Sequence, residues 1–159
     1  MRIGVISDTH NNLYFLDMAV KKMGKIDMLI HLGDNYNDAV KANEIYKLPL
    51  EYVSGNNDYG YESIAYQTLI LNGKRILITH GHRYRVYYDL NTLYYKALEE
   101  KADMVLYGHT HRQSIEWIGN VLFVNPGSPS LPRDGKPGAA VVSIDENGGF
   151  DVEMISLIR

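Results

Sequence analysis

Five short clusters of histidine, aspartate, asparagine and glycine recur along the chain, and each follows an apolar run typical of a buried strand. The clusters are Asp8-Thr9-His10, Gly33-Asp34, Gly55-Asn56-Asn57-Asp58, His80-Gly81-His82 and Gly108-His109-Thr110-His111. In an α/β sheet the carboxyl ends of the strands form one crevice, so we expect all five clusters at a common edge. Core packing alone does not require such convergence. Imidazoles and carboxylates gathered in this way are typical of a metal site.

The opening third of the chain alternates strand-like and helix-like patterns. Strands are predicted at residues 2–7, 28–32 and 50–53, and helices at residues 13–23, capped by Asn11 or Asn12, and 38–46. This βαβαβ order favours parallel strands with helices packed against the sheet.

The second half of the chain has a different pattern, in which hairpins replace the crossover helices. Three hairpins are predicted, at residues 68–79 around Asn72-Gly73, 115–124 around Gly119-Asn120 and 139–155 around Asn147-Gly148-Gly149. One further strand is expected at residues 104–107 and one long helix at 86–101. A mixed α/β fold with more than one sheet follows.

Composition limits the classes of protein that this chain can form. With 159 residues, 45% of them hydrophobic, it can bury one core, and we expect a single domain over residues 1–159. No segment approaches the ~20 apolar residues that span a bilayer, and cysteine is absent, so we expect a cytoplasmic protein without membrane contact. A net charge of −3 argues against nucleic acid as a partner, although Arg83, Arg85 and Arg133 could form a local basic rim.

Each cluster taken alone has an ordinary structural explanation. A lone aspartate after a strand is typical of a turn or a helix cap, and His31, inside an apolar run, is expected to be a buried core histidine. The pair His109 and His111 is more specific, because Gly108 lets the backbone turn so that two imidazoles can reach neighbouring ions. Five clusters in order at strand ends are not explained by local structure alone.

The ordered set Asp-x-His, Gly-Asp, Gly-Asn-x-Asp, His and Gly-His-x-His resembles the motif set of the calcineurin-like metallophosphoesterase superfamily. The small size, the Asn125-Pro126-Gly127-Ser128 stretch and Pro132-Arg133 make the chain similar to the compact bacterial and archaeal branch of YfcE-type phosphodiesterases. The resemblance covers essentially the whole chain. It implies an α/β (α+β) fold, a four-layer αββα sandwich of two mixed β-sheets flanked by helices, with two divalent metal ions at the strand ends.

The resemblance also implies a ligand set for each ion. The first ion is assigned to Asp8, His10, Asp34 and His111, and the second to Asp34, Asn56, His80 and His109, so that Asp34 bridges the two. A bridging carboxylate suits two cations ~3.5–4 Å apart, which together acidify a shared water and clamp the phosphoryl oxygens during in-line attack. Oxygen and nitrogen ligands suit Mn²⁺, Fe²⁺, Zn²⁺, Ni²⁺ or Co²⁺, and the family resemblance favours Mn²⁺.

The implied function is that of a metal-dependent phosphodiesterase that hydrolyses small phosphodiesters through a metal-bridging hydroxide. Two alternatives remain: a phosphomonoesterase that uses the same site, and a non-catalytic scaffold like the eukaryotic retromer subunit that shares this fold. Every expected ligand position holds a competent residue, which favours catalysis. A nuclease would need a basic track or an added domain, for which this chain leaves little room. A homo-oligomer, either a dimer or a tetramer, is compatible with the sequence.

One departure from the family pattern concerns proton donation. Many members have histidine where this chain has Asn57, and an amide cannot deliver a proton at neutral pH. Asn57 therefore favours substrates with activated aryl leaving groups. His82, two residues from His80, is either a substitute acid or a polar neighbour of the ligands. Arg133 either binds the substrate phosphate or is a surface arginine. The expected catalytic residues are Asn56, Asn57, His82 and Arg133.

Tyrosine is abundant, with 13 residues in the chain. Tyr84, Tyr87, Tyr88 and Tyr95 follow the His80-Gly81-His82 cluster at helical spacing. Such a stripe is typical of packing or of a subunit interface. The alternative is an aromatic wall beside the site that holds a nucleoside or an aryl group.

Overall fold

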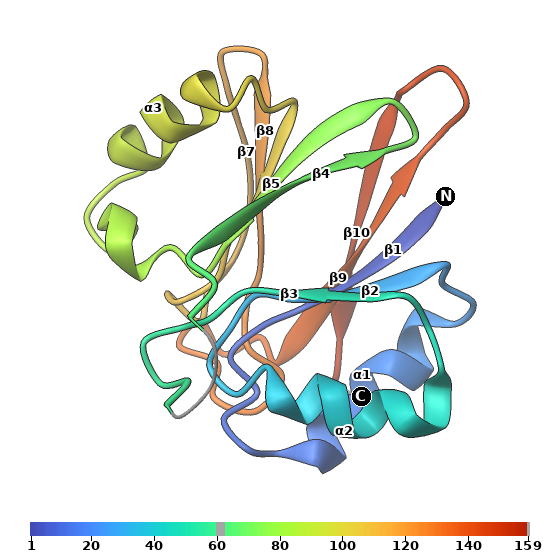
Figure 1. Cartoon of the computed structure of the whole chain (residues 1–159). Helices are drawn as coiled ribbons and strands as arrows, with labels where there is room; N and C mark the ends of the chain where they lie inside the picture. Colours follow the sequence, from blue (N-terminus) through green and yellow to red (C-terminus); the bar gives the residue numbers. More distant parts are fainter. Residues whose placement is uncertain (60–62, 159) are drawn as a thin grey trace.

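The computed structural model describes residues 1–59 and 63–158, and it arranges them as two facing β-sheets with helices outside (Figure 1). Its elements are β1 (Arg2–Ile6), α1 (Leu13–Met23), β2 (Met28–His31), α2 (Asn37–Tyr46), β3 (Leu50–Tyr52), β4 (Tyr66–Leu71), β5 (Lys74–Thr79), η1 (His82–Tyr84), α3 (Asn91–Glu99), β6 (Met104–Leu106), β7 (Gln113–Ile118), β8 (Val121–Pro126), β9 (Gly138–Ile144) and β10 (Phe150–Ser156).

Each sheet contains three parallel strands. One sheet has the order β10-β9-β1-β2-β3 and the other β4-β5-β6-β8-β7. The strands β1, β2 and β3 run parallel, as do β5, β6 and β8, which confirms the predicted βαβαβ opening. The three predicted hairpins also form, as the antiparallel pairs β4–β5, β7–β8 and β9–β10.

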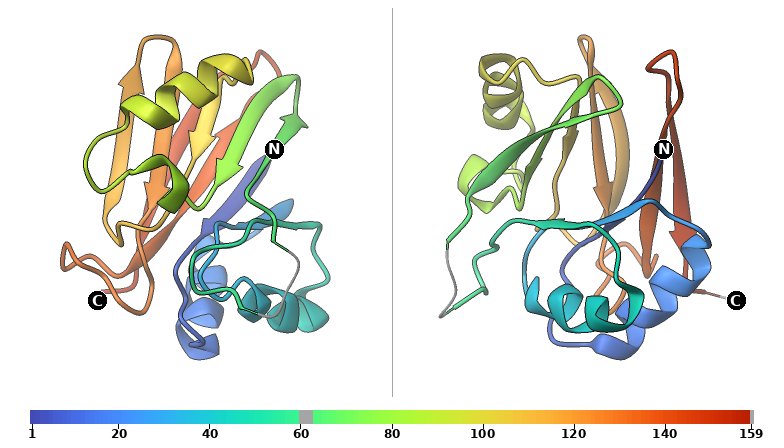
Figure 2. Two further views of the ribbon diagram at one scale, coloured as in Figure 1. Left: turned by 60° about the vertical axis from the view of Figure 1, so that its left-hand side comes forward. Right: turned by 45° about the vertical axis from the view of Figure 1, so that its right-hand side comes forward.

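The two sheets face each other and the helices lie on their outer faces (Figure 2), and apolar clusters lie between these layers. Ile30 and Ile76 belong to the core between the two sheets. The helices α1 and α2 cover the outer face of the first sheet, where Leu16 is buried, and α3 covers the second sheet by packing Leu93 in a cluster with Phe123. The predicted four-layer αββα sandwich is therefore confirmed. None of the helices in the described ranges is long and apolar enough to cross a bilayer.

The helix α1 begins where the sequence predicts because Asn12 caps it. Asn12 Oδ1 accepts a hydrogen bond from the backbone N–H of Phe15 at 3.1 Å. Its buried residues recur at helical spacing, and they are Leu16, Ala19, Val20 and Met23. This apolar face lies on the sheet, and the crossover keeps β1 and β2 parallel. The residues that follow both strands are thereby brought to one edge.

The prediction of one long helix at residues 86–101 is wrong at the start of the helix. The helix α3 begins only at Asn91, and the single 3₁₀ turn η1 precedes it. Arg85 follows η1 with a left-handed φ of 57°, so η1 and α3 are not parts of one continuous helix. Asp89 Oδ1 then accepts a hydrogen bond from the backbone N–H of Asn91 at 2.9 Å, which satisfies a donor in the first turn of α3.

The tyrosine stripe consequently does not form one face of a helix. Tyr84 lies in η1, and Tyr87 and Tyr88 lie in the loop before α3. Tyr87, Tyr88 and Tyr95 are 48%, 78% and 70% exposed, so they do not pack in the core of the chain, and a subunit interface stays a prediction. Any role of these three side chains is at the surface.

We expect the cluster under α3 to contribute far more stability than an exposed aromatic side chain of the same sheet. Phe123 is fully buried, whereas Trp117 is 59% exposed. Phe123→Ala should lower the free energy of unfolding by about 3–5 kcal/mol through lost burial and a cavity. Trp117→Ala should change it by less than about 1 kcal/mol. Urea denaturation measures both values, and equal losses would contradict the packing of α3 described above.

Candidate metal centre

The polar clusters of the sequence lie together at the carboxyl ends of parallel strands. The side chains brought together are Asp8 and His10 after β1, Asp34 after β2, His80 after β5, and His109 and His111 after β6. The backbone N–H of Asp8 donates to Gly33 O at 2.9 Å, and that of His109 donates to Asp8 Oδ2 at 3.0 Å. These bonds join the strand ends of both sheets, so the two sheets share one group of side chains.

Four of these side chains form a group that could hold a metal ion. One ligand atom from each lies within 4.8 Å of the others, and the residues are Asp8, His10, Asp34 and His111. His111 Nε2 lies 3.2 Å from Asp8 Oδ1, and His10 Nε2 lies 3.5 Å from Asp34 Oδ2. This group is the set of residues that the sequence assigns to the first ion.

His80 and His109 adjoin this group on the other side of Asp34. His80 Nε2 lies 3.6 Å from Asp34 Oδ1 and 3.7 Å from Asp8 Oδ1. His109 Nδ1 lies 3.2 Å from His80 Nε2. Asp34 therefore faces His10 with one carboxylate oxygen and His80 with the other, which is the arrangement that a bridging carboxylate needs.

Backbone carbonyls orient two of the imidazoles. His80 Nδ1–H donates to Leu32 O at 2.8 Å, and His111 Nδ1–H donates to Leu131 O at 2.7 Å. Because Nδ1 carries the proton in the neutral ring, Nε2 of each histidine presents a lone pair to the carboxylates. Metal-binding histidines are held in this way by an outer hydrogen bond.

The spacing of the nitrogens and one unpaired oxygen fit metal ligation. His10 Nε2 and His111 Nε2 are 3.2 Å apart, as are His80 Nε2 and His109 Nδ1. Two nitrogens bound to one ion at ~2.1 Å lie roughly 3.0–3.4 Å apart in octahedral or tetrahedral geometry. Asp8 Oδ1 is buried and accepts no hydrogen bond from the described residues. A cation among the histidine nitrogens would satisfy this oxygen.

The charges of the group favour a cation. Burial alone would raise the pKa of Asp8, but His80, His111 and the Ser7 hydroxyl lower this pKa below its usual range. Burial would also lower the pKa of His111, but the neighbouring charge of Asp8 raises that pKa overall. Burial and His80 lower the pKa of His109. Asp8 is therefore an ionised carboxylate in a buried position.

Asp58 is a supporting residue whose role the sequence analysis missed. Its carboxylate accepts four backbone N–H hydrogen bonds of 2.7–3.1 Å, from Asp34, Asn35, Tyr36 and Gly55. These bonds tie the turn after β2 to the turn after β3. Gly55 is needed there, because a Cβ would lie 2.2 Å from Asp34 Oδ1. The place of Asp58 three residues after Gly55 is a turn signal that could have revealed this role.

His31 is a buried structural residue, as the sequence predicts. Its Nδ1 accepts the backbone N–H of Gly33 at 3.0 Å, so Nε2 carries the proton and donates to Thr9 Oγ1 at 2.9 Å. Thr9 Oγ1 donates in turn to Asp38 Oδ2 at 2.7 Å. Burial lowers the pKa of His31 to about 3, which keeps the ring neutral. This line of hydrogen bonds ties the turn after β1 to α2.

Asn57 makes a contact that sequence reasoning did not foresee. Its backbone N–H donates to Asp34 Oδ1 and its side-chain amide donates to Asp34 Oδ2, both at 2.9 Å. Asn56 is exposed beside it. Ligation by Asn56 stays a prediction, whereas Asn57 is a neighbour that orients Asp34.

His82, Tyr87 and Arg133 lie at the rim of the group. The ring centroid of His82 is 5.3 Å from that of His80 and 6.1 Å from that of His109. His82 Nδ1 is buried without a hydrogen-bond partner among the described residues, and burial lowers the pKa of His82 to about 4. Tyr87 meets the ring of His109, and the guanidinium of Arg133 lies over Tyr87. Arg133 and His82 are thus near the group without belonging to its ligand atoms.

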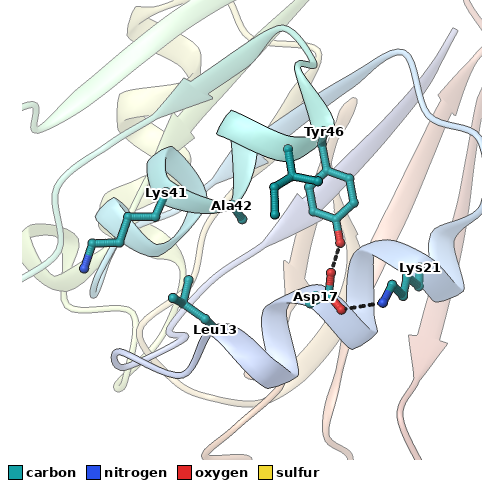
Figure 3. Close-up of a pocket in the computed structure, with 7 residues that line it drawn as sticks. Leu13, Asp17, Lys21, Lys41, Ala42 and Tyr46 are labelled. Atoms are coloured by element: carbon teal, nitrogen blue, oxygen red, sulfur yellow. Dashed lines mark hydrogen bonds and ion pairs between the residues drawn. The ribbon is translucent and has the colours of Figure 1, made fainter.

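A hollow of about 470 Å³ lies elsewhere, between α1 and α2 (Figure 3). Leu13, Ala42 and part of Tyr46 give it apolar walls, and Asp17 bonds there to the Tyr46 hydroxyl and to Lys21. None of the predicted ligands lines this hollow. This hollow is therefore separate from the candidate metal centre at the strand ends.

Comparison with known proteins finds a family match over most of the chain. Residues 1–147 match the family model of the calcineurin-like phosphoesterase superfamily domain. A Methanothermobacter thermautotrophicus protein named "Probable metallophosphoesterase" is 33% identical over 160 residues, which are 98% of this chain and 92% of the relative. A phosphodiesterase of Methanocaldococcus jannaschii is 28% identical over 144 residues, 80% of this chain and 83% of the relative.

Solved structures share the fold. A protein of Streptococcus pneumoniae described as a predicted phosphoesterase has a TM-score of 0.81 at 31% identity, over 98% of this chain and 88% of that chain. Vps29 of Entamoeba histolytica in complex with Zn²⁺ has a TM-score of 0.77 at 19% identity, over 98% of this chain and 99% of that chain. The second likeness concerns the fold alone.

Asp58→Ala should loosen the turn that carries Asp34. The change removes the acceptor of four backbone N–H groups, so we expect the free energy of unfolding to fall by about 1–3 kcal/mol. Asp145→Ala is a matched control, because Asp145 accepts two backbone N–H bonds, both at 2.8 Å, in an exposed turn. Its loss should be below about 1 kcal/mol. Urea denaturation measures the free energy of unfolding of both variants. An equal loss in the two would contradict the role of Asp58 in holding the turn that carries Asp34.

Proposed function

The chain belongs to the calcineurin-like phosphoesterase superfamily, and on this premise we propose that it is a metal-dependent phosphodiesterase that hydrolyses small phosphodiesters at a dinuclear site. The observation that carries the proposal is the position of Asp34 between two groups of histidine nitrogens. One carboxylate oxygen lies 3.5 Å from His10 Nε2 and the other lies 3.6 Å from His80 Nε2. A structural aspartate needs no such arrangement.

We assign the ligands of the two ions as the motif implies. The first ion takes Asp8, His10, Asp34 and His111, and the second takes Asp34, Asn56, His80 and His109. Two divalent ions bound there would acidify a water and neutralise charge on the phosphoryl oxygens. Oxygen and nitrogen ligands without sulfur suit several divalent metals, and we propose Mn²⁺ among them on the family resemblance.

The residues around the ligands keep them in position for this chemistry. The carbonyls of Leu32 and Leu131 hold the Nε2 lone pairs of His80 and His111 inward. Asn57 donates two hydrogen bonds to the Asp34 carboxylate and so restrains its orientation. Rigid ligands of this kind keep the reacting groups aligned before the substrate arrives.

The leaving group is where this chain differs from many members of its family. Asn57 uses its amide on Asp34 and has no acidic proton to give to a leaving oxygen. Aryl oxides leave without such help, so we propose activated aryl diesters as the best synthetic substrates. His82, whose ring lies 5.3 Å from that of His80, is the remaining candidate for proton transfer to poorer leaving groups.

The two alternatives predict different behaviour at the same group. A phosphomonoesterase would use the same ligands, and the phosphodiesterase from Methanocaldococcus jannaschii among the relatives is our reason for preferring diesters. A scaffold of the retromer type gains nothing from ionised Asp8 in a buried position, since a buried charge is costly unless it is compensated. Catalysis gives this costly arrangement a use.

Removal and return of metal tests the proposal directly. The metal-stripped protein should not hydrolyse a bis-aryl phosphodiester, and added Mn²⁺ should restore this hydrolysis. With Mn²⁺, turnover of the bis-aryl diester should exceed turnover of an aryl monoester or an alkyl diester. Asp34→Asn should reduce turnover by more than the ~10–100-fold loss typical of residues that only support ligands. Steady-state kinetics with single added ions measures these rates. Absence of turnover with every divalent ion would reject the enzyme, and near-normal activity of Asp34→Asn would reject the dinuclear site.

The neighbouring asparagines provide a matched pair of variants. We expect Asn56→Ala to lower the bound metal from two ions to one per chain, because it removes an oxygen ligand of the second ion. Asn57→Ala should keep both ions and weaken their binding only about 10–100-fold, because it frees Asp34. Elemental analysis after dialysis measures the stoichiometry. Loss of the second ion from Asn57→Ala but not from Asn56→Ala would move the ligand assignment to Asn57.

A further inference from the structure

Tyr87 occupies a defined place beside the proposed second ion. Its ring meets the ring of His109 edge-on, with centroids 4.5 Å apart and an interplanar angle of 68°. Tyr87 is nevertheless 48% exposed, so the ring borders both the ligand group and the solvent. The loop before α3 therefore contributes an aromatic wall to the rim of the site.

Arg133 reaches the same place from the loop after β8. Its backbone N–H donates to His111 O at 2.9 Å, and its guanidinium carbon lies 5.2 Å from the ring centre of Tyr87. Stacking on an aromatic ring orders a planar guanidinium and leaves N–H donors at its edge. Among the residues that the structure describes, no carboxylate lies within ion-pair distance of Arg133. The rim thus carries an ordered cation that forms no ion pair with the residues in the described ranges.

We propose that Arg133, held in place by Tyr87, binds a third non-bridging oxygen of the phosphate group and thereby sets how well the site accepts monoesters relative to diesters. The inference rests on the proposed function, because it needs a phosphate at the two ions. Arg133 is then a substrate-binding residue, and Tyr87 is a positioning residue that acts through it.

The number of oxygens on the substrate is the physical basis of this selectivity. A phosphodiester has two non-bridging oxygens, one for each cation of a two-ion site. A monoester or inorganic phosphate has at least one more charged oxygen, which can accept hydrogen bonds from the N–H groups of a guanidinium. Loss of the Arg133 guanidinium should therefore weaken the binding of monoesters and inorganic phosphate more than the binding of diesters.

A matched control pair, Arg85 and Tyr88, lies in the same loop before α3 as Tyr87. The guanidinium carbon of Arg85 lies 5.0 Å from the ring centre of Tyr88, which repeats the contact between Arg133 and Tyr87. Tyr88 is 78% exposed and lies, like Arg85, in the segment between η1 and α3. Arg85→Met and Tyr88→Leu remove the same chemistry without touching the site.

Calorimetric titration of the Mn²⁺-loaded protein with inorganic phosphate tests the inference without turnover. Arg133→Met should weaken phosphate binding by about 10-fold or more, the size expected for a charge-assisted hydrogen bond. Tyr87→Leu should weaken it severalfold, Tyr87→Phe should retain it, and the double variant Tyr87→Leu/Arg133→Met should bind no more weakly than Arg133→Met alone. Arg85→Met and Tyr88→Leu should bind as the unaltered protein does, and metal content is measured in every variant.

Kinetics then test the selectivity. In Arg133→Met, kcat/KM should fall about 10-fold or more for an aryl monoester but by less than about 3-fold for a bis-aryl diester. Unchanged phosphate binding, an equal loss in Arg85→Met, or no phosphate binding by the unaltered protein would overturn the inference even in an active enzyme. Phosphate binding that depends on Arg133 in a protein without turnover would instead reject the proposed function and leave Arg133 as a phosphate-binding residue.

Discussion

Burial of the Asp8 carboxylate is the constraint on which the rest of the site depends. A buried charge is costly unless hydrogen bonds or opposite charges compensate it. Ser7 Oγ and the backbone N–H of His109 both donate to Asp8 Oδ2, while Oδ1 is left facing histidine nitrogens. The turn after β6 approaches so closely that a Cβ on Gly108 would lie 2.1 Å from Ser7 Oγ. One carboxylate therefore joins the two sheets at the candidate metal centre.

The backbone that presents the ligands is strained, and its neighbours hold it. Five predicted ligands have left-handed φ values of 49° to 72°, namely Asp8, His10, Asp34, His109 and His111. Such a conformation costs roughly 1–2 kcal/mol per residue that is not glycine. Ser128 Oγ donates to Asp8 O, and Asn125 Nδ2 donates to Gly108 O, so buried polar residues from β8 and the turn after it restrain two of these turns. Hydrogen bonds within the fold thus hold the backbone that carries the predicted ligands.

Periodicity predicted the strands and hairpins because it reports which face of each element is buried. The residues at the strand ends were predictable from the motif order, since parallel strands bring their carboxyl ends together. The contacts of Asp58 and Asn57 with the turn at Asp34 were not, because they join positions more than 20 residues apart in the sequence. The link from His31 through Thr9 to Asp38 was hidden for the same reason. Patterns along a chain describe elements, whereas these hydrogen bonds depend on how the elements meet.

Periodicity wrongly predicted a helix in the segment before α3, and this segment contributes Tyr87 to the rim of the site. The ligands of a dinuclear centre would be the same for a diesterase, a monoesterase or an idle relative, so they cannot decide among substrates. That decision belongs to the loops at the rim, which are free to vary because they carry little of the core. Tyr87 lies in the irregular loop before α3, and from there its ring meets the ring of His109. The departure from regular structure is what places an aromatic ring and, through it, the Arg133 guanidinium beside the ligands.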